Sequence, residues 1–101
     1  MAAKILHTFN KSPISPVLDS CLRFTGEDDA LVLLEDGVYT ATAAWGVKLD
    51  ELIDAGVPVY VIKIDVDARG LANRLIEDVQ VIEYDGFVDL CANYEVVKSW
   101  F

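Results

Sequence analysis

The feature that most constrains the fold of this chain is an uninterrupted apolar run, Ala30-Leu-Val-Leu-Leu34. A strand whose successive side chains are all apolar is typical of a parallel sheet that helices cover on both faces. Further apolar runs of strand length lie at residues 5–9, 58–64 and 79–84. We therefore expect residues 30–34 to form the central strand of a mostly parallel sheet of about four to five strands.

The segments between these runs have helical patterns. After Ser15-Pro16, which fits an N-cap and a first helical position, Leu18, Cys21 and Leu22 begin an amphipathic stripe that ends near Gly26. Asp28-Asp29 then interrupts the pattern before the next strand. Further helical pieces are predicted at residues 38–45, 48–55, 65–71 and 87–94. Alternating strands and helices with no linker or repeat predict one three-layer α/β/α domain over residues 1–101.

The charge balance excludes several classes of partner. The chain has 101 residues, with 8 Lys and Arg against 17 Asp and Glu, for a net charge of -9. A large basic patch cannot form from so few scattered cations, so we expect no direct binding of nucleic acid or of an anionic membrane. No apolar run approaches the roughly 18 residues of a membrane span. The sequence therefore predicts a cytoplasmic protein.

The cysteines predict neither a disulfide framework nor a metal site. Cys21 and Cys91 are far apart in sequence, and His7 is the one histidine, so a Cys/His zinc set cannot be completed. The chain also lacks a glycine-rich phosphate loop and a serine nucleophile elbow. We expect free thiols, no metal and no cofactor, and we do not expect the chain to be a self-sufficient enzyme.

Candidate site residues follow the predicted strands, since the carboxyl ends of parallel strands meet at one rim of the sheet. They are His7, Lys11, Asp36 and Arg69. His7 is either a general base or a structural histidine, because nothing in the sequence pairs it with a second chemical group. The acidic turn at Asp36 and the loop at Lys11 fit partner binding and ordinary loop structure alike.

The thiols and the C-terminal tail have two interpretations each. Cys21 is near the start of the first predicted helix, where a thiolate is favoured, but it also belongs to the apolar stripe. It is therefore a candidate persulfide carrier or a packing residue, whereas Cys91 is expected only to pack. Trp100, in the terminal Trp100-Phe101 pair, either docks on its own domain or packs on a neighbouring subunit.

Four blocks of the sequence resemble the DsrH/TusB family. They are Leu6-His-Thr-Phe-Asn-Lys-Ser-Pro13, Leu33-Leu-Glu-Asp-Gly-Val-Tyr39, Asp67-Ala-Arg-Gly-Leu71 and Tyr84-Asp-Gly-Phe-Val-Asp-Leu90, followed by a terminal Trp. The blocks occur in order at the four predicted strand-to-loop junctions, almost from end to end of the chain. Phe101 departs from the family members that stop at Trp.

The resemblance implies a DsrE-like α/β domain and a place in a heterohexamer that holds two copies each of three related subunits. In the family, this complex relays persulfide sulfur to a small carrier, DsrC in sulfur oxidation or TusE in tRNA thiolation. The principal sulfur-carrying cysteine belongs to the DsrE/TusD-like subunit, and the comparable loop here, at residues 63–70, has no cysteine. The resemblance thus implies an accessory subunit that assembles with DsrE/TusD-like and DsrF/TusC-like partners.

The two branches of the family differ at the first helix. DsrH proteins resemble this chain in carrying a cysteine there, as in Asp19-Ser-Cys-Leu-Arg-Phe24, whereas TusB proteins commonly lack it. Cys21 therefore favours a DsrH-like subunit of a DsrEFH-type complex. The alternatives are a TusB-like subunit that supports 2-thiolation of the tRNA wobble uridine, and a structural or regulatory binding domain with no sulfur chemistry of its own.

Overall fold

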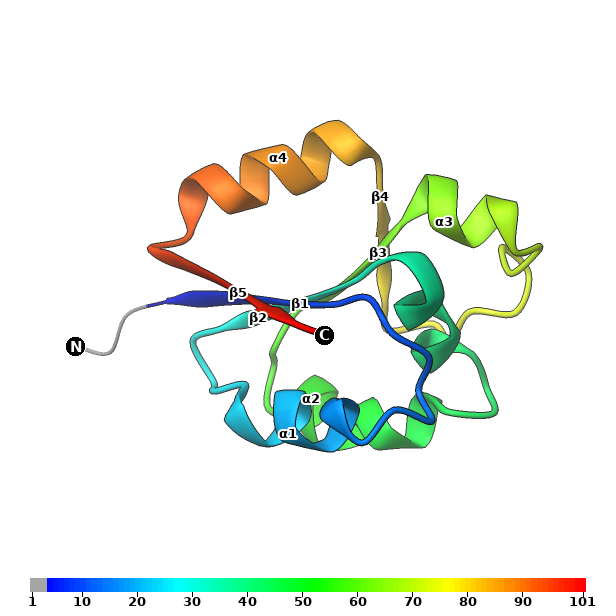
Figure 1. Ribbon diagram of the computed structural model, residues 1–101, viewed down its shortest axis with the longest axis horizontal. Coiled ribbons are helices and arrows are strands. Elements are labelled where there is room, and N and C mark those ends of the chain that lie inside the picture. The colour runs from blue at the N-terminus through cyan, green and yellow to red at the C-terminus, as the bar shows by residue number, and fades with distance from the viewer. Residues whose placement is uncertain (1–3) are drawn as a thin grey trace.

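The computed structural model describes residues 4–101, which form a five-stranded parallel sheet with helices on both faces (Figure 1). The strands are β1 (Ile5–Phe9), β2 (Ala30–Leu33), β3 (Val59–Ile62), β4 (Gln80–Ile82) and β5 (Val96–Trp100). Their order across the sheet is β4-β3-β2-β1-β5, and every pair of neighbours is parallel. The predicted α/β fold with a mostly parallel sheet is confirmed.

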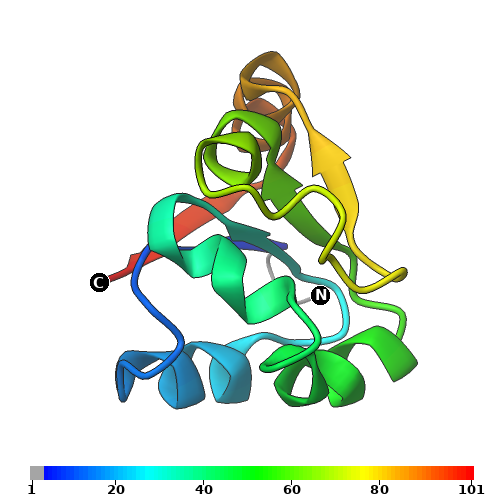
Figure 2. The ribbon, with the colours of Figure 1, turned by 90° about the vertical axis from the view of Figure 1, so that its right-hand side faces the viewer.

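The helical segments fill the connections between strands. They are α1 (Val17–Phe24), the 3-10 helices η1 (Glu35–Ala41) and η2 (Gly46–Leu49), α2 (Asp50–Asp54), α3 (Lys63–Ala68) and α4 (Tyr84–Asn93). Helices α1 and α2 cover one face of the sheet, and α4 covers the other (Figure 1). The view along the sheet in Figure 2 separates these layers. No helix within residues 4–101 is both long and apolar enough to cross a membrane.

Two apolar clusters lie on the two faces of the sheet. The larger cluster packs Phe9, Leu31 and Leu33 of the strands against α1, η1 and α2. The smaller cluster packs Leu6 and Val32 against α4. All four residues of β2 are buried, as a strand covered on both faces requires. The central position predicted for residues 30–34 is therefore correct.

The turn after β2 passes very close to the end of β1. A Cβ atom placed on Gly37 would lie 2.2 Å from the backbone oxygen of Phe9, so only glycine fits there. This contact explains the Asp36-Gly37 pair. The segment expected to be a helix at residues 38–45 is instead η1, which begins earlier and ends at Ala41. The piece expected at 48–55 divides into η2 and α2.

The third strand is shorter than its apolar run suggests. β3 ends at Ile62, and α3 begins at Lys63 rather than at Asp65. Ile64 is 70% exposed on that helix. The apolar residue thus does not extend the buried strand.

The fifth strand comes from the segment that the sequence presented only as a tail. Residues Val96–Trp100 pair with β1 in parallel, from Ile5 opposite Val96 to Phe9 opposite Trp100. β1 therefore lies inside the sheet, between β2 and β5. Of the two interpretations of the tail, docking on its own domain is the one seen in the structure.

Candidate functional site

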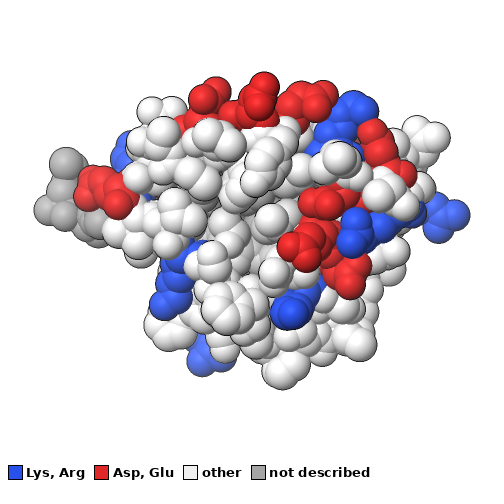
Figure 3. Space-filling model, turned by 45° about the horizontal axis from the view of Figure 1, so that its top comes forward, with Lys and Arg blue, Asp and Glu red and all other residues white. Residues whose placement is uncertain are grey.

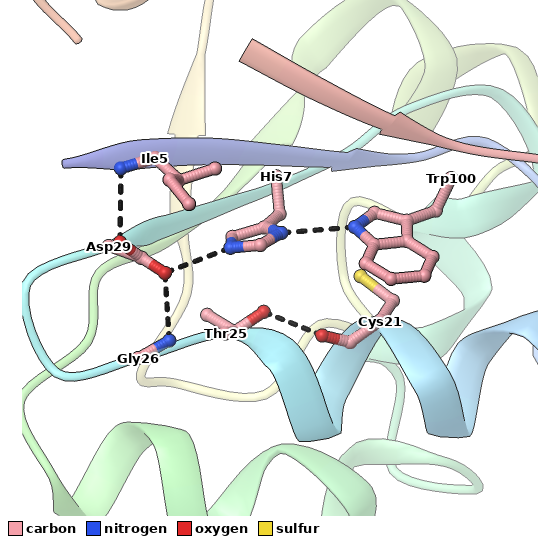
Figure 4. A network of polar contacts seen from close by, with 7 residues as sticks. All are labelled: Ile5, His7, Cys21, Thr25, Gly26, Asp29 and Trp100. Atoms are coloured by element: carbon pink, nitrogen blue, oxygen red, sulfur yellow. Dashed lines mark hydrogen bonds and ion pairs between the residues drawn. The ribbon is translucent and has the colours of Figure 1, made fainter. Parts of the chain in front are cut away.

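The most organised polar group in the described chain is a buried network centred on His7 (Figure 4). The His7 side chain points from β1 toward the α1 side of the sheet and is 1% exposed. Its Nε2 lies 2.9 Å from Asp29 Oδ2, and its Nδ1 lies 3.0 Å from Trp100 Nε1. The network therefore joins β1, the start of β2 and the end of β5.

The partner on each side determines which nitrogen of His7 carries the proton. The indole nitrogen of Trp100 can only donate a hydrogen bond, so His7 Nδ1 must accept with its lone pair. A proton on Nε2 can then be donated to the Asp29 carboxylate. In this arrangement neither ring nitrogen is free to act as a general base, which favours the structural interpretation of His7.

Asp29 is held by two backbone groups as well as by His7. Its carboxylate accepts hydrogen bonds from the N–H groups of Ile5 at 3.0 Å and Gly26 at 2.8 Å. Burial alone would raise the pKa of Asp29, but the hydrogen bonds from Gly26, His7 and Ile5, with the attraction of His7, lower it below its ordinary value. The Asp29 carboxylate thus links the segment just after α1 to the start of β1.

Trp100 connects the network to the surface. Its ring stacks on Phe24 of α1, with ring centroids 5.9 Å apart, and Lys98 Nζ lies 4.6 Å from the indole centroid. A second side-chain hydrogen bond joins β1 and β5: Thr8 Oγ1 donates to Ser99 Oγ at 3.2 Å. These contacts attach the C-terminal strand to the sheet beyond its backbone hydrogen bonds.

Cys21 lies beside this network in the apolar interior. Figure 4 shows its side chain directed toward the indole of Trp100, and it is fully buried. Burial raises the pKa of the Cys21 thiol to about 12, against an opposing hydrogen bond with the Thr25 side chain. A protonated thiol that solvent does not reach is a poor nucleophile, so this environment favours the packing interpretation of Cys21.

Cys91 differs from Cys21 in position and in exposure. It lies on α4, is half-buried, and packs against the smaller apolar cluster on the other face of the sheet. Burial raises its pKa as well. Both thiols are free, and they lie on opposite faces of the sheet.

Two of the predicted rim residues meet at the carboxyl end of the sheet. Arg69 lies 3.0 Å from Asp36 Oδ1 through both Nε and Nη2, and its Nη1 donates to the backbone oxygen of Asp65 at 3.1 Å. The Asp65 carboxylate accepts from the N–H of Glu35, whose φ is +50°, in the left-handed region that non-glycine residues seldom adopt. This cluster fixes the turn after β2 against α3.

The other two rim candidates do not belong to that cluster. Lys11 is exposed and makes no ion pair with a residue of the described chain. His7 was expected at the rim, but it lies in the middle of β1, where its side chain is buried between Asp29 and Trp100. The sequence also did not indicate Asp29, which resembled an ordinary chain break, although a histidine in an apolar strand needs a polar partner.

The remaining surface of residues 4–101 offers one cavity and no candidate metal site. Within residues 4–101, no three His, Cys, Asp or Glu side chains lie close enough to hold a metal ion. A cavity of about 590 Å³ lies between residues 39–44 and residues 71–75, with Arg74 as its charged lining residue. None of the predicted site residues lines this cavity.

Comparison with known proteins first defines the class of fold. The structure is similar to the crystal structure of the ychN protein from E. coli, with a TM-score of 0.87 over 98% of this chain and 100% of that one. Their sequences are 22% identical, so this likeness concerns the fold. The solution structure of Tm0979 from Thermotoga maritima has a TM-score of 0.61 and 32% identity, over 87% of this chain and 91% of that one.

The family itself follows from sequence. Residues 11–97 match the family described as DsrH like protein. Protein TusB of Pectobacterium parmentieri is 38% identical over 96 residues, which are 95% of this chain and all of that protein. Protein TusB of Klebsiella pneumoniae is 40% identical over the same shares. The chain belongs to the DsrH/TusB family, whose members are subunits of sulfur-relay complexes.

The comparisons confirm the family and bear on its two branches. The preference for the DsrH side depended on Cys21 alone, whereas these nearly full-length relatives are TusB proteins. They therefore favour the TusB alternative over the DsrEFH interpretation. The same cysteine is buried, so it is weak evidence for a shared chemical role.

Proposed function

We propose that this chain is a TusB-type accessory subunit of a cytoplasmic sulfur-relay complex that supports 2-thiolation of the tRNA wobble uridine. The observation that carries this proposal is the match to TusB proteins over 95% of this chain and the whole of the relative. Its partners are then TusD-like and TusC-like subunits, and a TusE-like protein accepts the sulfur. The acidic surface fits contact with these proteins and not with the tRNA itself.

In this proposal the chain does not carry the sulfur. The segment that follows β3, residues 63–70, where a TusD-like subunit would have its sulfur-carrying cysteine, has none here. Of the two thiols, that of Cys21 is buried and has a raised pKa, and that of Cys91 is half-buried and has a raised pKa as well. Transfer of a persulfide requires an accessible thiolate to attack the terminal sulfur, and Cys21 offers neither property.

The exposed rim supplies candidate partner contacts. Lys11 follows β1, Asp36 lies in η1 after β2, and Arg69 lies at the end of α3 after β3. None of them is needed for the buried network. We propose that these side chains face a partner subunit or the sulfur carrier, and that Trp100 supports a subunit interface by fixing β5. The alternative of a structural or regulatory binding domain denies only that Cys21 takes part in sulfur chemistry, and it is compatible with the same fold and the same contacts.

Deletion of the gene in its own host tests the function. In the deletion strain we expect loss of the thiolated wobble nucleoside from digested tRNA, measured by liquid chromatography and mass spectrometry, with sulfur oxidation intact. A plasmid with the natural sequence should restore it. Retained thiolation together with lost sulfur oxidation would instead select the DsrH branch, and no change in either would leave a binding domain.

A matched pair of variants tests the part played by Cys21. Complementation with Cys21→Ala should restore thiolation as well as Cys91→Ala does, because both thiols act by packing. A Cys21→Ala protein that folds and assembles but fails to restore thiolation would make Cys21 a carrier.

Native alkylation tests the same point on the purified protein. With iodoacetamide at pH 8, Cys91 should be modified before Cys21, since a thiol with a pKa of about 12 holds only roughly one part in ten thousand as thiolate. Modification in urea gives the reference in which both react. Preferential alkylation of Cys21 in the native state would contradict its burial.

A further inference from the structure

Within residues 4–101, the outer edge of β5 presents backbone groups that pair with no other strand. β5 is at one end of the strand order, and β1 is its one neighbour in the sheet. The N–H of Val96 donates to the backbone oxygen of Lys4, on the β1 side. Since alternate residues of a strand direct their N–H and C=O to the same side, Lys98 and Trp100 also face β1. Val97 and Ser99 therefore direct their backbone groups outward.

This edge is held rigidly enough to act as a template. Trp100 donates to the buried His7, and Thr8 donates to Ser99, so two side-chain bonds hold β5 at its carboxyl end. A strand that is already extended and fixed loses little conformational entropy when another strand pairs with it. The buried network thus prepares the outer edge for pairing.

Apolar side chains remain exposed along both faces of this edge. Val96 is 45% exposed and Val97 is 43% exposed, although they point to opposite faces of the sheet. Phe24 on α1 and Phe101 at the chain end are 64% and 77% exposed. A partner strand beside β5 would cover both valines at once, and an uncovered edge of this kind is prone to aggregate.

The charges beside the edge indicate the chemistry of the partner. Lys98 is exposed in the middle of β5, and Arg23 is exposed on α1, and neither forms an ion pair with a residue of the described chain. The acidic side chains in Figure 3 gather over its top and right and at its far left beside the grey residues. Glu95, which precedes β5, is exposed as well, so the unpaired cations stand toward the carboxyl end of the edge. The edge therefore complements an acidic segment.

A second copy of this chain does not satisfy these conditions. Two β5 strands paired about a two-fold axis would place their middle residues, the two Lys98 side chains, near each other. Like charges in that position oppose pairing. The geometry favours a different protein with carboxylates opposite Lys98.

We propose that the β5 edge binds an extended, acidic segment of a partner subunit, which adds a strand to the sheet next to Val97 and Ser99. This inference rests on the proposed function, because that function requires assembly with other subunits. The added strand would form backbone hydrogen bonds with Val97 and Ser99 and place a carboxylate near Lys98.

Proline at an outward position gives a selective test. Val97→Pro removes an outward N–H and leaves the hydrogen bonds to β1 in place. Val97→Ala is the matched control, since it shortens the same side chain and keeps the N–H. The variants are co-expressed with the TusC-like and TusD-like subunits of the same host, and the assemblies are weighed by native mass spectrometry.

We expect Val97→Pro to weaken assembly at least about tenfold, the factor that one lost hydrogen bond gives, and Val97→Ala to weaken it less. Lys98→Glu should weaken it as well, and more strongly at low salt than at high salt. Circular dichroism on the isolated variants confirms that each has folded. Assembly that is equal for Val97→Pro and the natural sequence overturns the proposal.

Amide exchange provides a second readout that does not depend on a variant. In the free chain, the backbone amides of Val97 and Ser99 should exchange quickly, while those of Lys98 and Trp100 are protected. Assembly should slow the exchange of the Val97 and Ser99 amides at least about tenfold. Assembly that leaves both amides unprotected removes this inference alone. If the natural chain does not assemble with these subunits, or assembles only with itself, the proposed function fails and this inference fails with it.

Discussion

The buried network at His7 and the exposed cluster at Arg69 each pair a carboxylate with a nitrogen donor, but the two pairs have different roles. His7 and the Asp29 side chain are 1% and 8% exposed, and the pair joins β1 to the loop before β2. Arg69 and the Asp36 side chain are 23% and 59% exposed, and the pair joins two surface turns. A buried charge must keep its partner, whereas an exposed one is solvated when its partner is lost. The first pair therefore supports the fold, and the second is available for contact with other proteins.

The largest expected effect comes from removing the buried carboxylate. Asp29→Ala leaves His7 and the N–H groups of Ile5 and Gly26 without their acceptor. We expect the free energy of unfolding to fall by about 3 to 5 kcal/mol, because each of these donors costs about 1 to 3 kcal/mol when it is left buried without an acceptor. Urea denaturation followed by circular dichroism measures this. A loss below about 1 kcal/mol would remove the distinction between the buried pair and the exposed pair.

Trp100→Phe should give the next largest effect. Phenylalanine keeps most of the apolar contact with Phe24 but removes the N–H that reaches His7. An unpaired buried acceptor costs about 1 to 3 kcal/mol in the free energy of unfolding. The same urea titration measures the loss, and Trp45→Phe is the control for replacing an indole. Equal stability of Trp100→Phe and Trp45→Phe would show that the hydrogen bond contributes nothing.

The stability of the protein should also depend on pH through Asp29. The pKa of Asp29 in the folded protein is lowered, so its carboxylate stabilises the fold fully above the unfolded value of about 3.9. This stabilisation is lost as the pH falls through the lower folded pKa. Urea titrations between pH 6 and pH 2 should show the loss in the natural chain and a smaller loss in Asp29→Asn. Parallel curves of unfolding free energy against pH for the two proteins would contradict this role of the Asp29 carboxylate.

The smallest effect is expected at the exposed pair. Asp36→Ala should change the free energy of unfolding by less than about 1 kcal/mol, because the Arg69 guanidinium is then solvated. If this surface contacts a partner, the variant should nevertheless weaken assembly with the TusC-like and TusD-like subunits. A large loss of stability with normal assembly would reverse the roles given to the two pairs.

Sequence reasoning predicted the parts of this molecule that depend on local pattern. The apolar run at residues 30–34 gave the central strand, and the stripe through Leu18 and Cys21 gave α1, because burial on one or both faces follows directly from periodicity. The run at residues 58–64 was overextended because Ile64 continues the apolar pattern while its backbone has already turned into α3.

The network could not be predicted in the same way, since its members are distant in sequence. His7 and Asp29 are 22 positions apart, and His7 and Trp100 are 93 positions apart. No spacing rule joins them until β5 is known to pair with β1. The β-branched pair Val96-Val97 was a weak signal of a strand, and a histidine within an apolar strand was a signal of a missing partner. Neither signal identified Asp29.

The protonation state of His7 tests the central claim of this account most directly. Nitrogen-15 NMR of the imidazole at neutral pH distinguishes a bare ring nitrogen from one that carries a proton. We predict a bare Nδ1, which accepts from Trp100, and a protonated Nε2, which donates to Asp29. The Trp100→Phe variant should shift the Nδ1 resonance while Trp45→Phe leaves it unchanged. A proton on Nδ1 in the natural chain would contradict the hydrogen bond from Trp100, and with it the anchoring of β5.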